Sequence, residues 1–179
     1  MRLPDRTYPI TLDATSIAQV LPHRGDILCV RRLTVLDFDH YIGHAVWPDD
    51  LSLLQGHFPG MPLVPGVLLI EAVAQVAGAG MLEGDATAHR FRSSHVGMLA
   101  AVRKCSFRRA VRPNEWVRID ARSRQMSLTS AVITAELQVG TEAAASVEIV
   151  LVNTPREVIA AALAQPPQGT AGPNTSTCL

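Results

Sequence analysis

Apolar and polar residues alternate along much of the second half of the chain. In WVRIDAR (116–122) Val117, Ile119 and Ala121 would share one face of an extended segment, with charged residues between them. A period of two is typical of a β-strand with one buried face. Runs of this kind, or with strand composition, predict strands over residues 26–38, 41–47, 96–109, 115–126, 128–139 and 143–152.

The segment from Pro62 to Leu82 has a different character, because it is almost continuously apolar. It predicts a helix from Gly66 to about Glu83, with Gly84-Asp85 as the stop signal. Shorter helices are expected over 13–20 and 155–164. The second of these follows Thr154-Pro155-Arg156-Glu157, which has the form of a capping box with proline at the first helical position.

The long helix is apolar enough to raise the possibility of a membrane span. Glu71, Gln75 and two prolines interrupt it, and a carboxylate at mid-bilayer costs roughly 2.5–3.5 kcal/mol. We therefore expect a buried core helix and no membrane association. One such helix amid antiparallel strands predicts an α+β domain whose sheet wraps the helix. The small residues between Ala72 and Gly80 would let strands approach it closely.

Composition narrows the class of protein. A length of 179 residues favours a single domain, expected here over 1–164 with a disordered tail over 165–179. The chain is 47% hydrophobic and 18% charged, which excludes a wholly disordered chain. Zero net charge and 4% aromatic residues argue against nucleic-acid binding. The three cysteines form no zinc-like spacing and the N-terminus lacks an apolar leader, so we expect a metal-free cytoplasmic protein.

The residues from Gly56 to Gln75 carry the candidate chemistry. Glu71 and Gln75 are four positions apart and so share one helix face. Apolar neighbours are expected to raise the pKa of Glu71, as a proton donor near neutral pH requires. His57 stands in a Gly/Pro-rich loop as a candidate base, and the N–H groups at Gly66 could polarise a carbonyl oxygen. These parts suit removal of an α-proton and loss of a β-hydroxyl, although a structural role for either residue is equally open.

Three motifs in order resemble the 3-hydroxyacyl-[acyl-carrier-protein] dehydratases of fatty-acid synthesis. They are LPHR (21–24), HFPGMPLVPGVLLIEAVAQ (57–75) and FRRAVRP (107–113), and the resemblance extends over roughly residues 15–152. It implies a hot-dog fold, in which an antiparallel β-sheet wraps one long central helix. It also implies a substrate carried on the phosphopantetheine of acyl carrier protein, with no metal or redox cofactor.

The resemblance assigns roles to individual residues. His57 becomes the catalytic histidine and Glu71 the catalytic acid, and a glutamate at 71 is typical of the branch that only dehydrates. Four further residues are expected to bind or support the substrate: Gly66, Val67, Gln75 and Phe58. The family's paired histidine and glutamate come from two subunits, which implies a homodimer or a trimer of dimers.

Some features leave alternatives open. Gly25 and Arg31 depart from the family pattern, which puts chain length and pathway in doubt. A hot-dog thioesterase, a CoA-linked enoyl hydratase and a non-catalytic acyl-carrier-binding subunit remain competing functions. His23, in LPHR, is interpreted as structural. Residues 103–124 hold eight Lys/Arg against two Asp/Glu, either an ordinary solvated face or a dock for acidic carrier protein. The residues proposed for that dock are Arg103, Lys104, Arg108 and Arg109.

Overall fold

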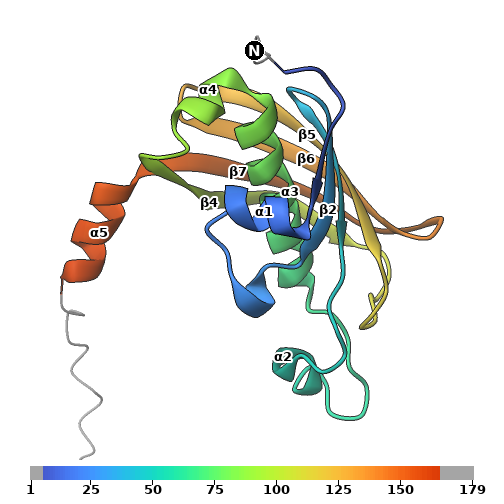
Figure 1. Ribbon diagram of the computed structural model, residues 1–179. Helices are drawn as coiled ribbons and strands as arrows, with labels where there is room; N and C mark the ends of the chain where they lie inside the picture. Colours follow the sequence, from blue (N-terminus) through green and yellow to red (C-terminus); the bar gives the residue numbers. More distant parts are fainter. Residues whose placement is uncertain (1–5, 166–179) are drawn as a thin grey trace, which may run out of the picture.

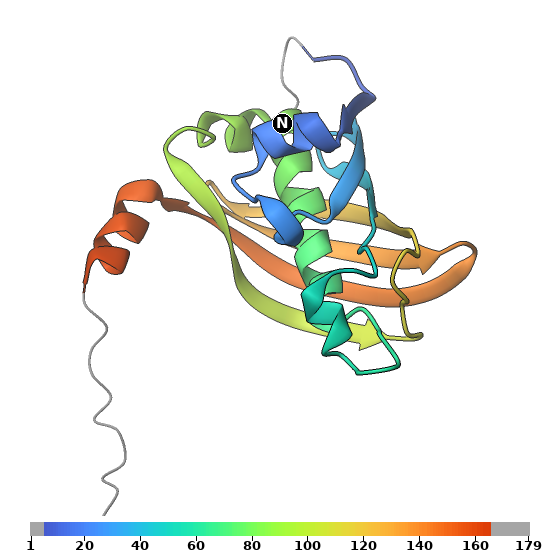
Figure 2. The ribbon, with the colours of Figure 1, turned by 60° about the horizontal axis from the view of Figure 1, so that its bottom comes forward.

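The computed structural model describes residues 6–165. One seven-stranded antiparallel sheet, in the order β1-β2-β3-β5-β6-β7-β4, curls around the long helix α3 (Figures 1 and 2). The strands are β1 (Ile10–Asp13), β2 (Val30–Asp37), β3 (His40–Ala45), β4 (His95–Phe107), β5 (Val117–Ser127), β6 (Ser130–Val139) and β7 (Glu142–Pro155). The helices are α1 (Ala14–Val20), α2 (Ser52–Gln55), α3 (Gly66–Gly84), α4 (Ala86–Arg90) and α5 (Arg156–Ala164), with a 3-10 turn, η1 (Gly25–Ile27).

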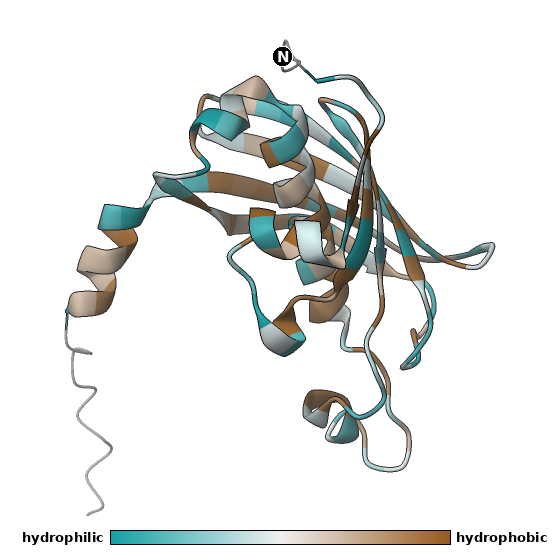
Figure 3. Cartoon of the chain, in the orientation of Figure 1, coloured by the Kyte–Doolittle hydropathy of each residue, from teal (hydrophilic) through white to brown (hydrophobic). Residues whose placement is uncertain are grey.

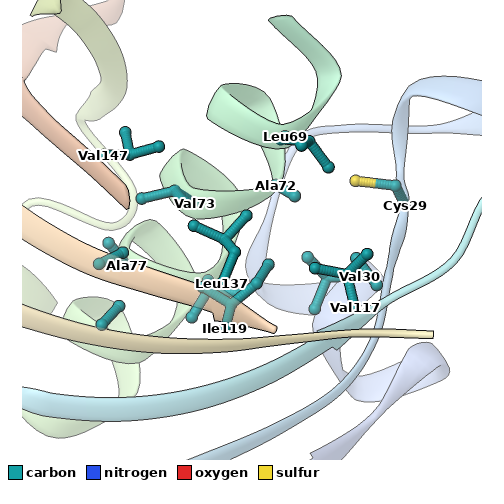
Figure 4. Packing of buried hydrophobic residues seen from close by; sticks show 14 of the residues in the cluster. Cys29, Val30, Leu69, Ala72, Val73, Ala77, Val117, Ile119, Leu137 and Val147 are labelled. Atoms are coloured by element: carbon teal, nitrogen blue, oxygen red, sulfur yellow. The ribbon is translucent and has the colours of Figure 1, made fainter. Parts of the chain in front are cut away.

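This architecture is the predicted α+β hot-dog fold. The alternation in β5 holds: Val117, Ile119 and Ala121 are fully buried, and the charged residues between them lie on the outer face. Their register partners Leu137 and Ala135 on β6 continue the same inner layer. Figure 4 shows Ile119 and Leu137 of this layer lying between the sheet and α3. Burial of each Val, Leu or Ile side chain of this layer stabilises the folded state by about 1.5–3 kcal/mol relative to leaving it exposed to water.

Close approach of the sheet to α3 depends on small residues, as predicted. A Cβ added at Gly80 would lie 2.4 Å from the ring of Tyr41, and one added at Gly43 on β3 would lie 2.1 Å from Val76. The helix therefore forms the centre of the domain, and half of its most apolar stretch of residues is buried. Its length and hydropathy would also suit a membrane span, but the sheet occupies the place that lipid would take.

Several local predictions were incomplete or wrong. The segments β1, α2 and α4 were not predicted, and β2 begins at Val30 rather than at residue 26. The capping box before α5 is absent, because Thr154 and Pro155 still belong to β7 and Pro155 itself is the N-cap without a side-chain bond. The predicted tail over 165–179 lies outside the described residues except for Gln165.

Candidate active site

Gln75 fixes the carboxylate of Glu71 in place. Both residues lie one turn apart on α3, and the Gln75 amide nitrogen donates to Glu71 Oε1 at 2.9 Å. The same nitrogen donates to the carbonyl of Ile27 at 2.6 Å, and the amide oxygen accepts from the N–H of Cys29 at 3.2 Å. Gln75 is 1% exposed, so its amide is a buried bridge between α3 and the chain that enters β2. Figure 4 shows the neighbouring Cys29 beside this part of the helix.

His23 is a site residue that the sequence interpretation assigned to structure alone. Its Nε2 lies 3.3 Å from Glu71 Oε1, and its Nδ1 is buried without a partner among residues 6–165. The loop between α1 and η1 brings it there, because Leu21 ends α1 and the chain turns back over α3. The LPHR motif was the available signal, since it was one of the three segments that carried the family resemblance.

The predicted direction of the Glu71 pKa is wrong for the single chain. Desolvation by burial is the largest influence and raises the pKa, as expected, but hydrogen bonds from His23 and Gln75 outweigh it. The pKa of Glu71 is therefore lowered from its ordinary value of 4.5. In the isolated chain this carboxyl is ionised at neutral pH, and it accepts hydrogen bonds rather than donating one.

His57 lies in the loop between α2 and α3, half-buried. Its Nδ1 lies 3.3 Å from the carbonyl of Leu63, and its ring stacks on Phe58 with centroids 4.3 Å apart. A carbonyl only accepts, so Nδ1 carries the proton and the lone pair of neutral His57 is on Nε2. That nitrogen can accept a proton from a substrate. Phe58 is 50% exposed and leaves one side of this pair open to another molecule.

The N-terminus of α3 presents free donors, as predicted. Within the described residues no acceptor meets the N–H of Gly66 or Val67, whereas Leu68 already donates to the carbonyl of Pro65 at 2.9 Å. A Cβ at Gly66 would lie 2.5 Å from the Phe107 ring, so a larger residue at this position would have to displace the ring or the helix. Two N–H groups at the positive end of a helix suit a developing oxyanion.

A pocket of about 210 Å³, with more apolar than polar surface, runs along α3 from the carboxylate. Glu71 and His23 line one end, and Ala74, Gly78 and Leu82 continue the wall along the same helix face. His57 and Gly66 do not line it. A single chain therefore holds a carboxylate with its pocket and a histidine with its N–H donors, but it does not bring the two halves into one cavity.

Three of the four residues proposed to dock the carrier protein form ion pairs with residues of the same chain. Arg103 lies 3.7 Å from Glu148, Arg108 lies 3.0 Å from Glu136, and Arg109 contacts Glu115 at 3.0 Å. Lys104 has no ion pair within residues 6–165 and lines a groove on the outer face of the sheet.

The residues that the structure describes contain no group of three or more His, Cys, Asp and Glu side chains that could hold a metal ion.

Comparison with known proteins agrees with this architecture. A family model described as a FabA-like domain matches residues 21–148. The 3-hydroxyacyl-[acyl-carrier-protein] dehydratase FabZ of Desulforamulus reducens is 35% identical over 139 residues, which cover 77% of this chain and 94% of the relative. The enzyme of the same name from Caldanaerobacter subterraneus subsp. tengcongensis is 33% identical over 144 residues, covering 79% and 97%.

A solved structure extends the comparison to the fold. The dehydratase heterocomplex ApeI:P from Xenorhabdus doucetiae superposes with a TM-score of 0.66 at 15% identity, over 89% of this chain and all of that chain. At that identity the match speaks for the fold alone. The sequence relatives show the family of this chain, and the solved structure shows the same fold.

Proposed function

Because the chain belongs to the FabA-like family, we propose that it dehydrates (3R)-3-hydroxyacyl thioesters on acyl carrier protein to trans-2-enoyl thioesters. The enzyme is a 3-hydroxyacyl-[acyl-carrier-protein] dehydratase, a lyase of fatty-acid or related acyl synthesis. One observation carries the assignment of its site. A carboxylate held by Gln75 and His23 opens onto an apolar pocket, while a histidine and free N–H donors stand outside it.

The reaction divides among these groups. Nε2 of His57 takes the α-proton, and the electrons of that C–H bond form the new double bond as the β C–O bond breaks. The N–H of Gly66 holds the thioester oxygen while negative charge builds on it. Glu71 gives its proton to the leaving hydroxyl, which departs as water, and the proton on His57 restores the starting state. Val67 and Phe58 flank the substrate, and the chemistry needs no metal or redox cofactor.

Glu71 must be protonated to act as the acid, although it is ionised in the single chain. Burial is already the largest influence on its pKa and acts upward. A second subunit and an acyl chain over the carboxyl would remove more water and raise the pKa further. This is one reason to place His57 of one subunit opposite Glu71 of another, in a homodimer that can assemble further. We place the enzyme in the cytoplasm, because its substrate is carrier-linked and because Cys29 and Cys105 are free thiols.

Subunit complementation tests the shared site. His57→Ala and Glu71→Gln should each lower turnover of a carrier-linked 3-hydroxyacyl substrate by about 10²–10⁴-fold. Mixing the two inactive proteins and allowing exchange yields heterodimers in half of all pairs, each with one intact site. Activity should return to about one quarter of wild type.

Two results would contradict the proposal. No recovery, with exchange confirmed by mass spectrometry, would place both residues in one chain's site. With crotonyl thioesters, hydration to the 3-hydroxybutyryl thioester is expected. Release of free thiol instead would identify a thioesterase.

A further inference from the structure

Helix α5 stands apart from the rest of the domain. It continues from the end of β7 and projects past the sheet (Figures 1 and 3), beyond the residues matched by the family model. The N–H of Arg156 donates to the carbonyl of Ser94 at 2.9 Å, which ties only its first turn to the chain before β4. From Val158 to Ala164 every residue is apolar, and only Ile159 is even partly buried.

The apolar side chains of α5 form one face. At 100° per residue, Val158, Ile159 and Leu163 lie on the same side of the helix, and Glu157 and Ala161 lie on the other. Val158 is 54% exposed and Leu163 is 81% exposed, so the domain does not cover this face. A nine-residue helix gains too little from its own hydrogen bonds to be stable in water. Its stability therefore calls for a surface outside the domain described here.

The position of α5 indicates where that surface lies. The helix begins where Pro155 pairs with His95, the first residue of β4. Among residues 6–165, strand β4 is one edge of the sheet, with β7 as its only neighbour, and Met98, Leu99 and Val102 are 43–46% exposed along it. A long open edge with apolar side chains is a template for pairing with another strand.

Symmetry then places α5 against a particular part of the second copy. Two β4 strands that pair antiparallel about a two-fold axis bring the first residues of one beside the last residues of the other. The end of β4 is Phe107, whose ring contacts Gly66 at the start of α3. Phe107 is 51% exposed and Val67 is 69% exposed, so this end of the domain also has apolar surface to cover.

We infer that α5 is an arm that crosses to the second copy of the chain and packs its Val158, Ile159 and Leu163 face against the partner's surface around Phe107 and Val67. The inference rests on the two-subunit site proposed above. The arm stabilises the dimer, and it lies beside the N–H donors of the partner's site. It lies outside the part of the chain that the family model matches, since it begins after residue 148.

A pair of charge substitutions tests the arm. Leu163→Glu and Ala161→Glu each add one carboxylate to an exposed position of the same helix, but on opposite faces. In sedimentation equilibrium Leu163→Glu should raise the dimer dissociation constant at least tenfold, and Ala161→Glu should change it less than twofold. A chain truncated after Thr154 should match Leu163→Glu. Equal constants for both substitutions, or an unchanged constant on truncation, would overturn the inference.

Crosslinking tests the location. Leu163→Cys and Val67→Cys are placed in separate chains, both carrying Cys178→Ser, and the chains are mixed and oxidised. A disulfide-linked heterodimer is expected. A bond that forms only within one chain carrying both substitutions would mean that α5 folds back on its own domain, and no bond in either case would exclude this surface altogether. Both tests measure association of the chains and not turnover. Their results can therefore be interpreted even if the proposed activity is not found.

Discussion

Replacing Gly66 by alanine tests whether the start of α3 is the oxyanion site. The added Cβ would lie 2.5 Å from the Phe107 ring, and contacts below 3.4 Å force a neighbour to give way. Ring or helix must then move by about 0.9 Å, the difference between those two distances. Because Phe107 is 51% exposed, the ring has room to move, but it then leaves the helix end without its support.

Two magnitudes follow from that displacement. A shift of about 1 Å in a positioning group costs about 10²-fold in rate, which is the loss expected in kcat/KM. Overpacking costs about 1–3 kcal/mol, and the lower chain entropy of alanine offsets about 0.4–1 kcal/mol of it. The free energy of unfolding, measured by urea denaturation, should therefore fall by no more than about 2.6 kcal/mol.

A second substitution separates displacement from any other cause. Gly66→Ala with Phe107→Leu removes the clashing ring atoms and should recover most of the lost rate. Gly56→Ala is the matched control, because the nearest atom to its Cβ is 3.9 Å away. If Gly66→Ala alone keeps the wild-type rate, or if the double variant recovers nothing, the oxyanion assignment at Gly66 is wrong.

Three further predictions concern the rest of the site. Gln75→Leu leaves the part-buried carbonyl of Ile27 and the buried N–H of Cys29 unpaired, so the free energy of unfolding should fall by about 2–4 kcal/mol in urea titrations; an unchanged value would contradict the bridge. His23→Asn removes a group that lowers the pKa of Glu71, so the Glu71 limb of the kcat/KM profile should move to higher pH; a shift to lower pH would refute this. Arg108→Glu with Arg109→Glu should reduce turnover of carrier-linked substrate but not of an N-acetylcysteamine thioester, and equal losses would indicate a structural role.

The sequence was most informative where one local pattern decides the structure. The alternation in β5 and the small residues of α3 predicted the inner layer and its close packing, because both are set by side-chain size and period. Elements of five residues or fewer, such as β1 and α4, carry too short a pattern to be recognised. The capping box failed because pairing with β4 holds Thr154 in a strand.

The site shows the same division. Glu71 and Gln75 were placed together correctly, since four residues on a helix fix their spacing. The contact of His23 with Glu71 depends on how a loop returns over α3, which no local pattern describes. The pKa of Glu71 was predicted in the wrong direction for the same reason: burial could be inferred from apolar neighbours, whereas its hydrogen-bond donors come partly from that loop.

The order of strands has a consequence for how a new chain folds. Strands β5, β6 and β7 follow one another in sequence and in the sheet, so they can form as a meander of local hairpins. β4 precedes them in the chain but, in the part of the chain that the structure describes, pairs only with β7, from His95 opposite Pro155 to Phe107 opposite Ala145. During synthesis it must wait unpaired until its partner has been made, and such long loop closures are slow steps in folding. The edge that we propose to face a second copy is thus completed last, so association through it would be delayed until the rest of the sheet has formed.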